Sequence, residues 1–270
     1  MTAKPAAGTR SAGAASHLWA RPSFRRSLKQ AAAFVLSLFL VIGSWEVAGR
    51  LADTLILPPF SMVAIEFWRL VADGTLLGAT AQSVGALALG MFLSIVIGVA
   101  VGALMGRYRP VQYALDVYVD AAMSAPMIAF VPMFILLFGI GYETRVVTVI
   151  IFAIFPIIIN TFVGVRSVDP SLIEMSKSFG ANERQLFWQV RLPGAFPLMA
   201  SGLRLGTSRG VKGVVNGEVL IAVVGLGGLV KQYGNAFSMD GLYAIVIYLV
   251  IFAMILLTVV DRTLHALVRH

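Results

Sequence analysis

The chain has 270 residues, of which 59% are hydrophobic and 13% are charged, a composition outside the range of soluble domains and typical of polytopic membrane proteins. It contains no cysteine, which excludes a disulfide framework, a thiol nucleophile and a thiolate metal site. The net charge of +8 does not indicate nucleic-acid binding, because the basic residues lie mainly in the tails and in alternate loops, as the positive-inside rule predicts.

Residues 1–29 are rich in alanine, serine and arginine and lack apolar periodicity, which predicts a disordered basic cytoplasmic tail. A signal peptide or an organelle transit peptide has a similar composition. The apolar run that follows leads into Trp45 and Glu46 without a small-x-small cleavage site, so we expect it to remain as a signal anchor. Residues 30–270 then form the transmembrane domain.

The apolar stretches after the tail each have about the twenty residues that a bilayer crossing needs. They cover residues 30–50, 80–106, 112–138, 145–165, 196–222 and 242–261. The loops at 107–111 and 166–195 are basic, whereas the other loops are slightly acidic or nearly neutral. We therefore expect an all-α polytopic protein with six transmembrane helices in a bacterial inner membrane, with both termini in the cytoplasm.

The second stretch carries a small residue at every fourth position, on one face of the predicted helix. The members of this ladder are Ala86, Gly90, Ser94, Gly98, Gly102 and Gly106. Small side chains let helix backbones approach closely inside a membrane, so this face should pack against another helix. A role in binding solute is less favoured, because small side chains offer few contacts.

The third stretch contains Pro126 and Pro132, and the fourth contains Pro156, so these helices are expected to be kinked or interrupted at mid-membrane. Phe130 and Phe134 recur at helical spacing beside the first two prolines. They either line a route for solute or belong to ordinary helix packing.

A polar interruption at 169–193 is typical of a helix, a turn and a second helix. Asp169 and Ser171 are N-cap residue types, Gly180 suits the left-handed end of a helix, and Asn182 is a second N-cap candidate with Gln185 three residues later. The second helix is expected to end at Leu192 and Pro193.

The fifth stretch has an unusual density of charge next to apolar sequence. Its members are Arg204, Arg209, Lys212 and Glu218. Ionisable groups inside a membrane are candidates for a substrate pathway. Alternatively, Arg204 and Arg209 reach the headgroups and Lys212 pairs with a carboxylate, which leaves only Glu218 near the bilayer interior.

The 169–193 loop resembles the EAA motif of ABC importer permeases. The matching residues are Glu174, Met175, Ser176, Gly180, Val190, Leu192 and Pro193, with Met175 and Ser176 in place of the usual alanines. In that family the loop is a cytoplasmic coupling helix that docks on the ATP-hydrolysing subunit. The alternative is an amphipathic loop that lies in the lipid interface.

Further stretches resemble the permeases of the nitrate, sulfonate, taurine and bicarbonate branch. They are Trp45-Glu46, Leu57-Pro58-Pro59, 125–141, Asn160, Gly202-Leu203-Arg204, and Glu218 with Gly225-Leu226-Gly227. The resemblance implies a type I importer permease that acts as a homodimer, with two ATPase subunits that use ATP and Mg inside and a solute-binding protein outside. Its solute would be a small anion such as a sulfonate, taurine or nitrate.

The chain itself lacks the residues of an enzyme. No stretch matches the phosphate loop G-x-x-x-x-G-K-[ST], and no group of residues has the spacing of metal ligands, so we expect no cofactor on this chain. A transporter of another class, an ion-gradient-driven carrier that uses Glu218 as its protonatable group, leaves the 169–193 loop unexplained. A purely structural or signalling membrane protein is the third hypothesis.

Overall fold

The computed structural model describes residues 24–268 except 53, 55, 222 and 223, and its regular elements are all helical. In its first half the helices are α1 (Phe24–Ala52), α2 (Phe60–Ala72), α3 (Thr75–Arg107), α4 (Arg109–Ser124), the short 3₁₀ turn Met127–Phe130, and α5 (Val131–Phe138). In its second half they are α6 (Tyr142–Arg166), α7 (Pro170–Ser178), α8 (Glu183–Gln185), the π-helical turn Leu186–Arg191, α9 (Leu192–Ile221), α10 (Gly225–Asn235) and α11 (Met239–Val268).

The expected membrane spans coincide with these helices. Four helices of the described chain are long and apolar enough to cross a membrane, and the number rises to six if each of two bent helix pairs is one span. The expected tail at 1–29 lies mostly outside the described residues, and α1 already begins at Phe24. Two helices in predicted loops were missed: α2 lies within 51–79 and α10 within 223–241.

The proline predictions have different outcomes in the third and fourth spans. α4 and α5 meet at an angle of 96° around Pro126, which has no N–H to donate and which favours the extended conformation seen at Ala125. The third span is therefore interrupted, as predicted. In contrast, α6 continues through Pro156, so of the two expected outcomes an interruption does not occur there, and a kink stays a prediction.

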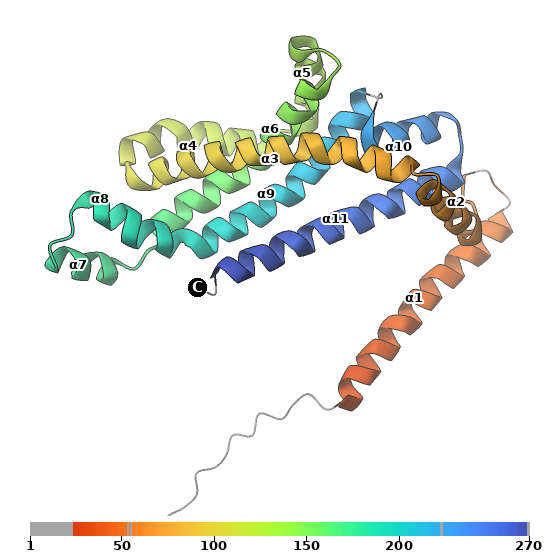
Figure 1. The fold of residues 1–270 in the computed structure, drawn as a ribbon, viewed down its shortest axis with the longest axis horizontal. Coiled ribbons are helices and arrows are strands. Elements are labelled where there is room, and N and C mark those ends of the chain that lie inside the picture. The colour runs from red at the N-terminus through yellow and green to blue at the C-terminus, as the bar shows by residue number, and fades with distance from the viewer. Residues whose placement is uncertain (1–23, 53, 55, 222–223, 269–270) are drawn as a thin grey trace, which may run out of the picture.

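The centre of the protein is the packing of α6 against α3 on one side and α9 on the other. Buried side chains from all three helices form one apolar cluster, with Leu87 from α3, Val149 and Ile157 from α6, and Val211 and Val214 from α9. α11 runs beside this core, whereas α1 leaves it at an angle and exposes apolar side chains (Figure 1). Such apolar surfaces are suited to contact with lipid chains.

The glycine ladder of α3 lies against α6. A Cβ atom added at Gly98 would come within 2.9 Å of Ile157, and one added at Gly102 would lie 2.5 Å from the Ile158 carbonyl oxygen and 2.7 Å from the Thr161 Cβ. Two helix backbones thus approach each other closely along this face, because the glycines provide no side chain between them.

Replacing Gly102 with alanine should destabilise the fold by about 2 kcal/mol, because the new methyl group overlaps the α6 backbone. Gly78 lies on the same helix with no atom near its absent Cβ, so Gly78→Ala is the matched control and should stabilise the helix by up to about 1 kcal/mol. Thermal unfolding of the detergent-purified variants measures both effects. Equal melting temperatures for the two variants would contradict this account of the ladder.

The first span is fixed to the body at its C-terminal end by two of the stretches singled out in the sequence. The Trp45 indole donates a hydrogen bond of 3.1 Å to the Pro58 carbonyl, and the Glu46 carboxylate accepts 2.9 Å and 3.0 Å hydrogen bonds from Ser61. Trp45-Glu46 and Leu57-Pro58-Pro59 therefore form one structural joint between α1 and α2.

Candidate functional site

The 169–193 segment folds as a capped helix, a tight turn and the start of a long helix. The Asp169 carboxylate caps α7 by accepting a hydrogen bond of 2.8 Å from the Ser171 N–H, which holds the pKa of Asp169 below its ordinary value. Gly180 ends the turn with φ at +82°, and Asn182 and Gln185 form a reciprocal capping box with two hydrogen bonds of 2.9 Å. These local predictions are confirmed.

The predicted end of the second helix is wrong. Helical structure continues from Glu183 through the π turn into α9, and Pro193 lies near the start of that helix. Pro193 cannot donate an i to i−4 hydrogen bond, and the wider π turn directly before it provides a helical path that does not require one. The 169–193 segment therefore passes into a membrane span without a break.

The apolar face of α7 has no partner within the described chain. The side chains of Leu172, Met175 and the C-cap residue Phe179 are 46%, 53% and 85% exposed, and Glu174 is exposed on the polar face of the same helix. Lys177 forms an exposed ion pair of 3.6 Å with Glu183 across the turn, of a kind that contributes little to stability. Figure 1 shows α7 and α8 at one end of the protein, far from α2 and α10 at the other.

A second constellation, which we name the Glu218 node, joins α3, α6, α9 and α10. Glu218 is completely buried, and its Oε2 accepts hydrogen bonds of 2.8 Å from the Ser83 hydroxyl and 3.0 Å from the Gly227 N–H. The Arg145 Nη1 lies 3.6 Å from Glu218 Oε1. The Glu218 carboxylate thus fixes the start of α10 to the core.

Backbone N–H groups at the start of α10 also bond to side chains of α3 at the Glu218 node. The Leu226 N–H donates to the Ser83 hydroxyl at 3.0 Å, and the Gly225 N–H donates to Gln82 Oε1 at 3.1 Å. Gly225 has φ at +77°, and a Cβ atom there would overlap the Glu218 carboxylate. The position therefore requires glycine on two grounds. The sequence signals for this node were the glycine run after Glu218 and a charged residue, Arg145, at the start of an apolar span.

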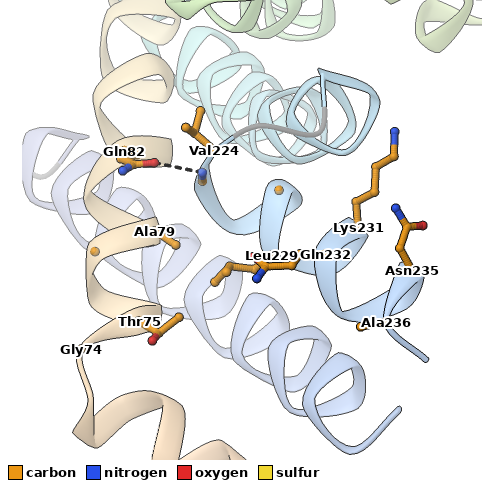
Figure 2. A pocket seen from close by; sticks show the side chains of 13 residues that line it. Gly74, Thr75, Ala79, Gln82, Val224, Leu229, Lys231, Gln232, Asn235 and Ala236 are labelled. Atoms are coloured by element: carbon orange, nitrogen blue, oxygen red, sulfur yellow. Dashed lines mark hydrogen bonds between the residues drawn. The ribbon is translucent and has the colours of Figure 1, made fainter. Parts of the chain in front are cut away.

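A cleft of about 790 Å³ lies beside the node, between the N-terminal turns of α3 and the length of α10. Figure 2 shows its polar lining, which includes Thr75, Gln82, Lys231, Gln232 and Asn235, and the hydrogen bond from Gly225 to Gln82 that closes one edge. The predicted pathway residues Pro126, Phe130, Phe134, Arg204, Lys212 and Glu218 are not among its lining residues.

The predicted pathway residues do not come together in one site. Phe130 and Phe134 stack with ring centroids 6.4 Å apart, Phe134 is buried, and Pro126 lies exposed at the break between α4 and α5. Arg204 pairs with Asp261 of α11 at 3.0 Å. Lys212 is exposed and has no carboxylate within 4 Å among the described residues, so the expected ion pair of Lys212 does not form. Arg204, which was expected to reach the headgroups, pairs with a carboxylate instead.

No group of three or more histidine, cysteine, aspartate or glutamate side chains in the described part of the chain could hold a metal ion. What the geometry provides is a bundle of membrane-crossing helices, an exposed amphipathic element at one end and a polar cleft at the other. These features define a multi-pass membrane protein.

Comparison with known proteins identifies the class. Residues 94–270 match the family of binding-protein-dependent transport system inner membrane components. The taurine transport system permease TauC of Escherichia coli is 33% identical over 78% of this chain and 79% of its own length. The riboflavin transport system permease RibX of Chloroflexus aurantiacus is 31% identical over 73% of this chain and 74% of its own.

The fold has a solved counterpart. The MetNI methionine ABC transporter, in an inward-facing conformation, aligns with a TM-score of 0.63 at 22% identity, over 71% of this chain and 95% of the aligned chain. The chain therefore belongs to the binding-protein-dependent transport system inner membrane components and is a permease of an ABC transport system with the type I fold. The alternative of an ion-gradient-driven carrier finds no support in these comparisons.

Proposed function

We propose that α7 and the turn after it dock on a separate ATPase subunit and that this contact couples ATP hydrolysis to movement of the helices. The observation that carries the proposal is the exposed apolar face of Leu172, Met175 and Phe179, with the exposed Glu174 on the polar side of the same helix, which is capped at its start and closed by Gly180. An amphipathic helix that presents such a face is suited to a groove on a partner protein.

The distribution of charge supports a cytoplasmic position for this segment. Arg107, Arg109 and Arg166 lie at the ends of α3, α4 and α6 that adjoin the 169–193 segment, and the segment itself carries Lys177, Arg184 and Arg191. By the positive-inside rule this end of the protein faces the cytoplasm, together with both termini.

The complete transporter would contain two copies of this permease, two ATPase subunits that bind ATP and Mg, and a solute-binding protein on the opposite face. The polar cleft between α3 and α10 lies at that opposite face. Transport would proceed by alternating access, in which a rigid-body change of the helices opens the pathway first to one side and then to the other.

The solute we propose is a small anion such as a sulfonate, taurine or nitrate, in line with the name of the taurine permease relative. The riboflavin permease relative shows that the family also includes members named for a larger cargo. A ligand screen on the cognate solute-binding protein decides between them, and a ligand without a sulfonate, nitrate or other anionic group would overturn the assignment.

The experiment that tests the coupling proposal is purification of the full-length chain from its native membrane in mild detergent, followed by mass spectrometry of the bound proteins. We expect a stoichiometric partner that contains a phosphate loop, and ATP-dependent solute uptake when the complex is placed in vesicles. A chain that is isolated alone and transports solute without ATP would contradict the proposal, as would a 169–193 segment that is protected by lipid instead of by a partner.

A further inference from the structure

Four arginines from separate parts of the chain line one cavity of about 330 Å³, which we name the arginine pocket. Arg107 is the last residue of α3, Arg109 the first of α4, Arg166 the last of α6, and Arg191 the last of the π turn. The remaining lining is apolar or backbone: Met105, Gly106, Val165, Val168, Pro170 and Ile173. Folding therefore collects four positive charges around a small, partly apolar cavity.

The charge of the arginine pocket is not balanced within the described chain. No carboxylate of the described residues lies within 4 Å of any of the four guanidinium groups, since the ion pairs of the chain involve other basic residues. Arg109 and Arg166 are exposed and Arg107 and Arg191 are partly buried. Four like charges that line one cavity without a carboxylate partner repel one another, so this arrangement favours an anion at the cavity.

The arginines have fixed surroundings that leave hydrogen-bonding capacity unused. The Arg107 guanidinium stacks 4.8 Å from the centre of the Phe187 ring, and Arg166 donates to Gln112 and lies over Phe162. The Arg191 Nε is buried and has no hydrogen-bond partner among the described residues. A buried N–H without a partner is unfavourable, and guanidinium groups bind phosphate oxygens with strong, charge-assisted hydrogen bonds.

The position of the pocket indicates which anion it takes. Three of its arginines stand at the ends of α3, α4 and α6 that we assign to the cytoplasmic side, where lipid phosphates would lie, and the lining also includes the apolar residues Met105 and Val165. Basic pockets between membrane helices on the cytoplasmic side are suited to phosphorylated lipid headgroups. A free phosphate ion has the same charge but no apolar group that would contact the apolar part of the lining.

We propose that the arginine pocket binds the phosphate of an anionic phospholipid from the cytoplasmic leaflet. The assignment to that leaflet rests on the orientation given under Proposed function, whereas the binding itself does not depend on the ATPase or on the solute. Because Pro170 and Ile173 of α7 also line the pocket, a bound headgroup would contact the base of the 169–193 segment.

The test is native mass spectrometry of the full-length protein in detergent, with dioleoylphosphatidylglycerol and dioleoylphosphatidylcholine as probes. We expect the wild type to retain the anionic lipid preferentially and Arg109→Gln/Arg191→Gln to lower its affinity about tenfold or more, since two charge-assisted contacts are lost. The matched control is Arg184→Gln/Arg262→Gln, which removes the same charge from exposed sites outside the pocket and should retain the lipid.

Several outcomes would overturn the proposal. Equal retention by the pocket variant and the wild type, or equal loss in the pocket and control variants, would show that the arginines form no specific site. Stabilisation by inorganic phosphate as large as that by the lipid would assign the pocket to a soluble anion. Loss of the lipid when the chain is isolated with its ATPase would assign the pocket to the partner protein. ATP-dependent uptake tests the coupling proposal separately, so the two can fail independently.

Discussion

Replacing Glu174 with arginine should abolish ATP-dependent uptake while the protein still inserts and folds in the membrane. Glu174 is exposed on α7, and in the described chain it forms no ion pair, so its reversal disturbs no internal contact. If α7 docks in a groove of the ATPase, a charge reversal within that contact costs about 2 kcal/mol or more, which corresponds to about thirtyfold weaker assembly.

The measurement is the amount of ATPase that co-purifies with the variant, together with uptake into vesicles. Glu143→Arg is the matched control, because Glu143 is an exposed glutamate near the start of α6, lies outside the 169–193 segment and forms no ion pair among the described residues. The control should retain most of the ATPase. Normal assembly and transport by the Glu174 variant would remove the coupling role from α7.

Replacing Glu218 with alanine should destabilise the protein by about 3–5 kcal/mol, because it leaves a buried arginine without its counter-ion. The same change removes the acceptor for the Ser83 hydroxyl and the Gly227 N–H, so the start of α10 loses its attachment to the core. Unfolding of the purified chain with increasing denaturant measures the loss. Glu143→Ala, at an exposed position near the start of α6, is the control and should change stability little.

A second pair of variants separates charge from hydrogen bonding in the Glu218 node. Glu218→Gln keeps an acceptor for Ser83 and Gly227 but leaves Arg145 unpaired, so it should be intermediate in stability. Adding Arg145→Met removes the unpaired charge and should restore stability to within about 1 kcal/mol of the wild type. If Glu218→Ala kept full stability and lost transport only, Glu218 would belong to the solute pathway instead of the node.

Sequence reasoning succeeded where the signal was local or periodic. The lengths of the apolar runs predicted the membrane helices, and the side-chain caps at Asp169 and Asn182 and the left-handed Gly180 predicted the shape of the 169–193 segment. Each of these features is determined by residues within a few positions of one another, so it can be read without knowledge of the fold.

Features that depend on distant contacts could not be predicted in the same way. The Glu218 node joins Ser83, Arg145 and Gly227 from different helices, and the arginine pocket joins residues from Arg107 to Arg191. α2 and α10 were missed because neither is long enough to resemble a membrane span, although both pack against α11. The continuation through Pro193 was missed because a π turn has no clear residue signature.

The continuity of α9 has a mechanical consequence. Its 30 residues form one continuous helix of about 45 Å, which follows the π turn at the end of the 169–193 segment and carries Glu218 near its far end. A continuous helix moves as a nearly rigid body, so a translation or rotation of one end also moves the other end. The π turn before α9 bends more easily than a regular α-helix. A small displacement of α7 would therefore be passed along α9 to the Glu218 node and the start of α10.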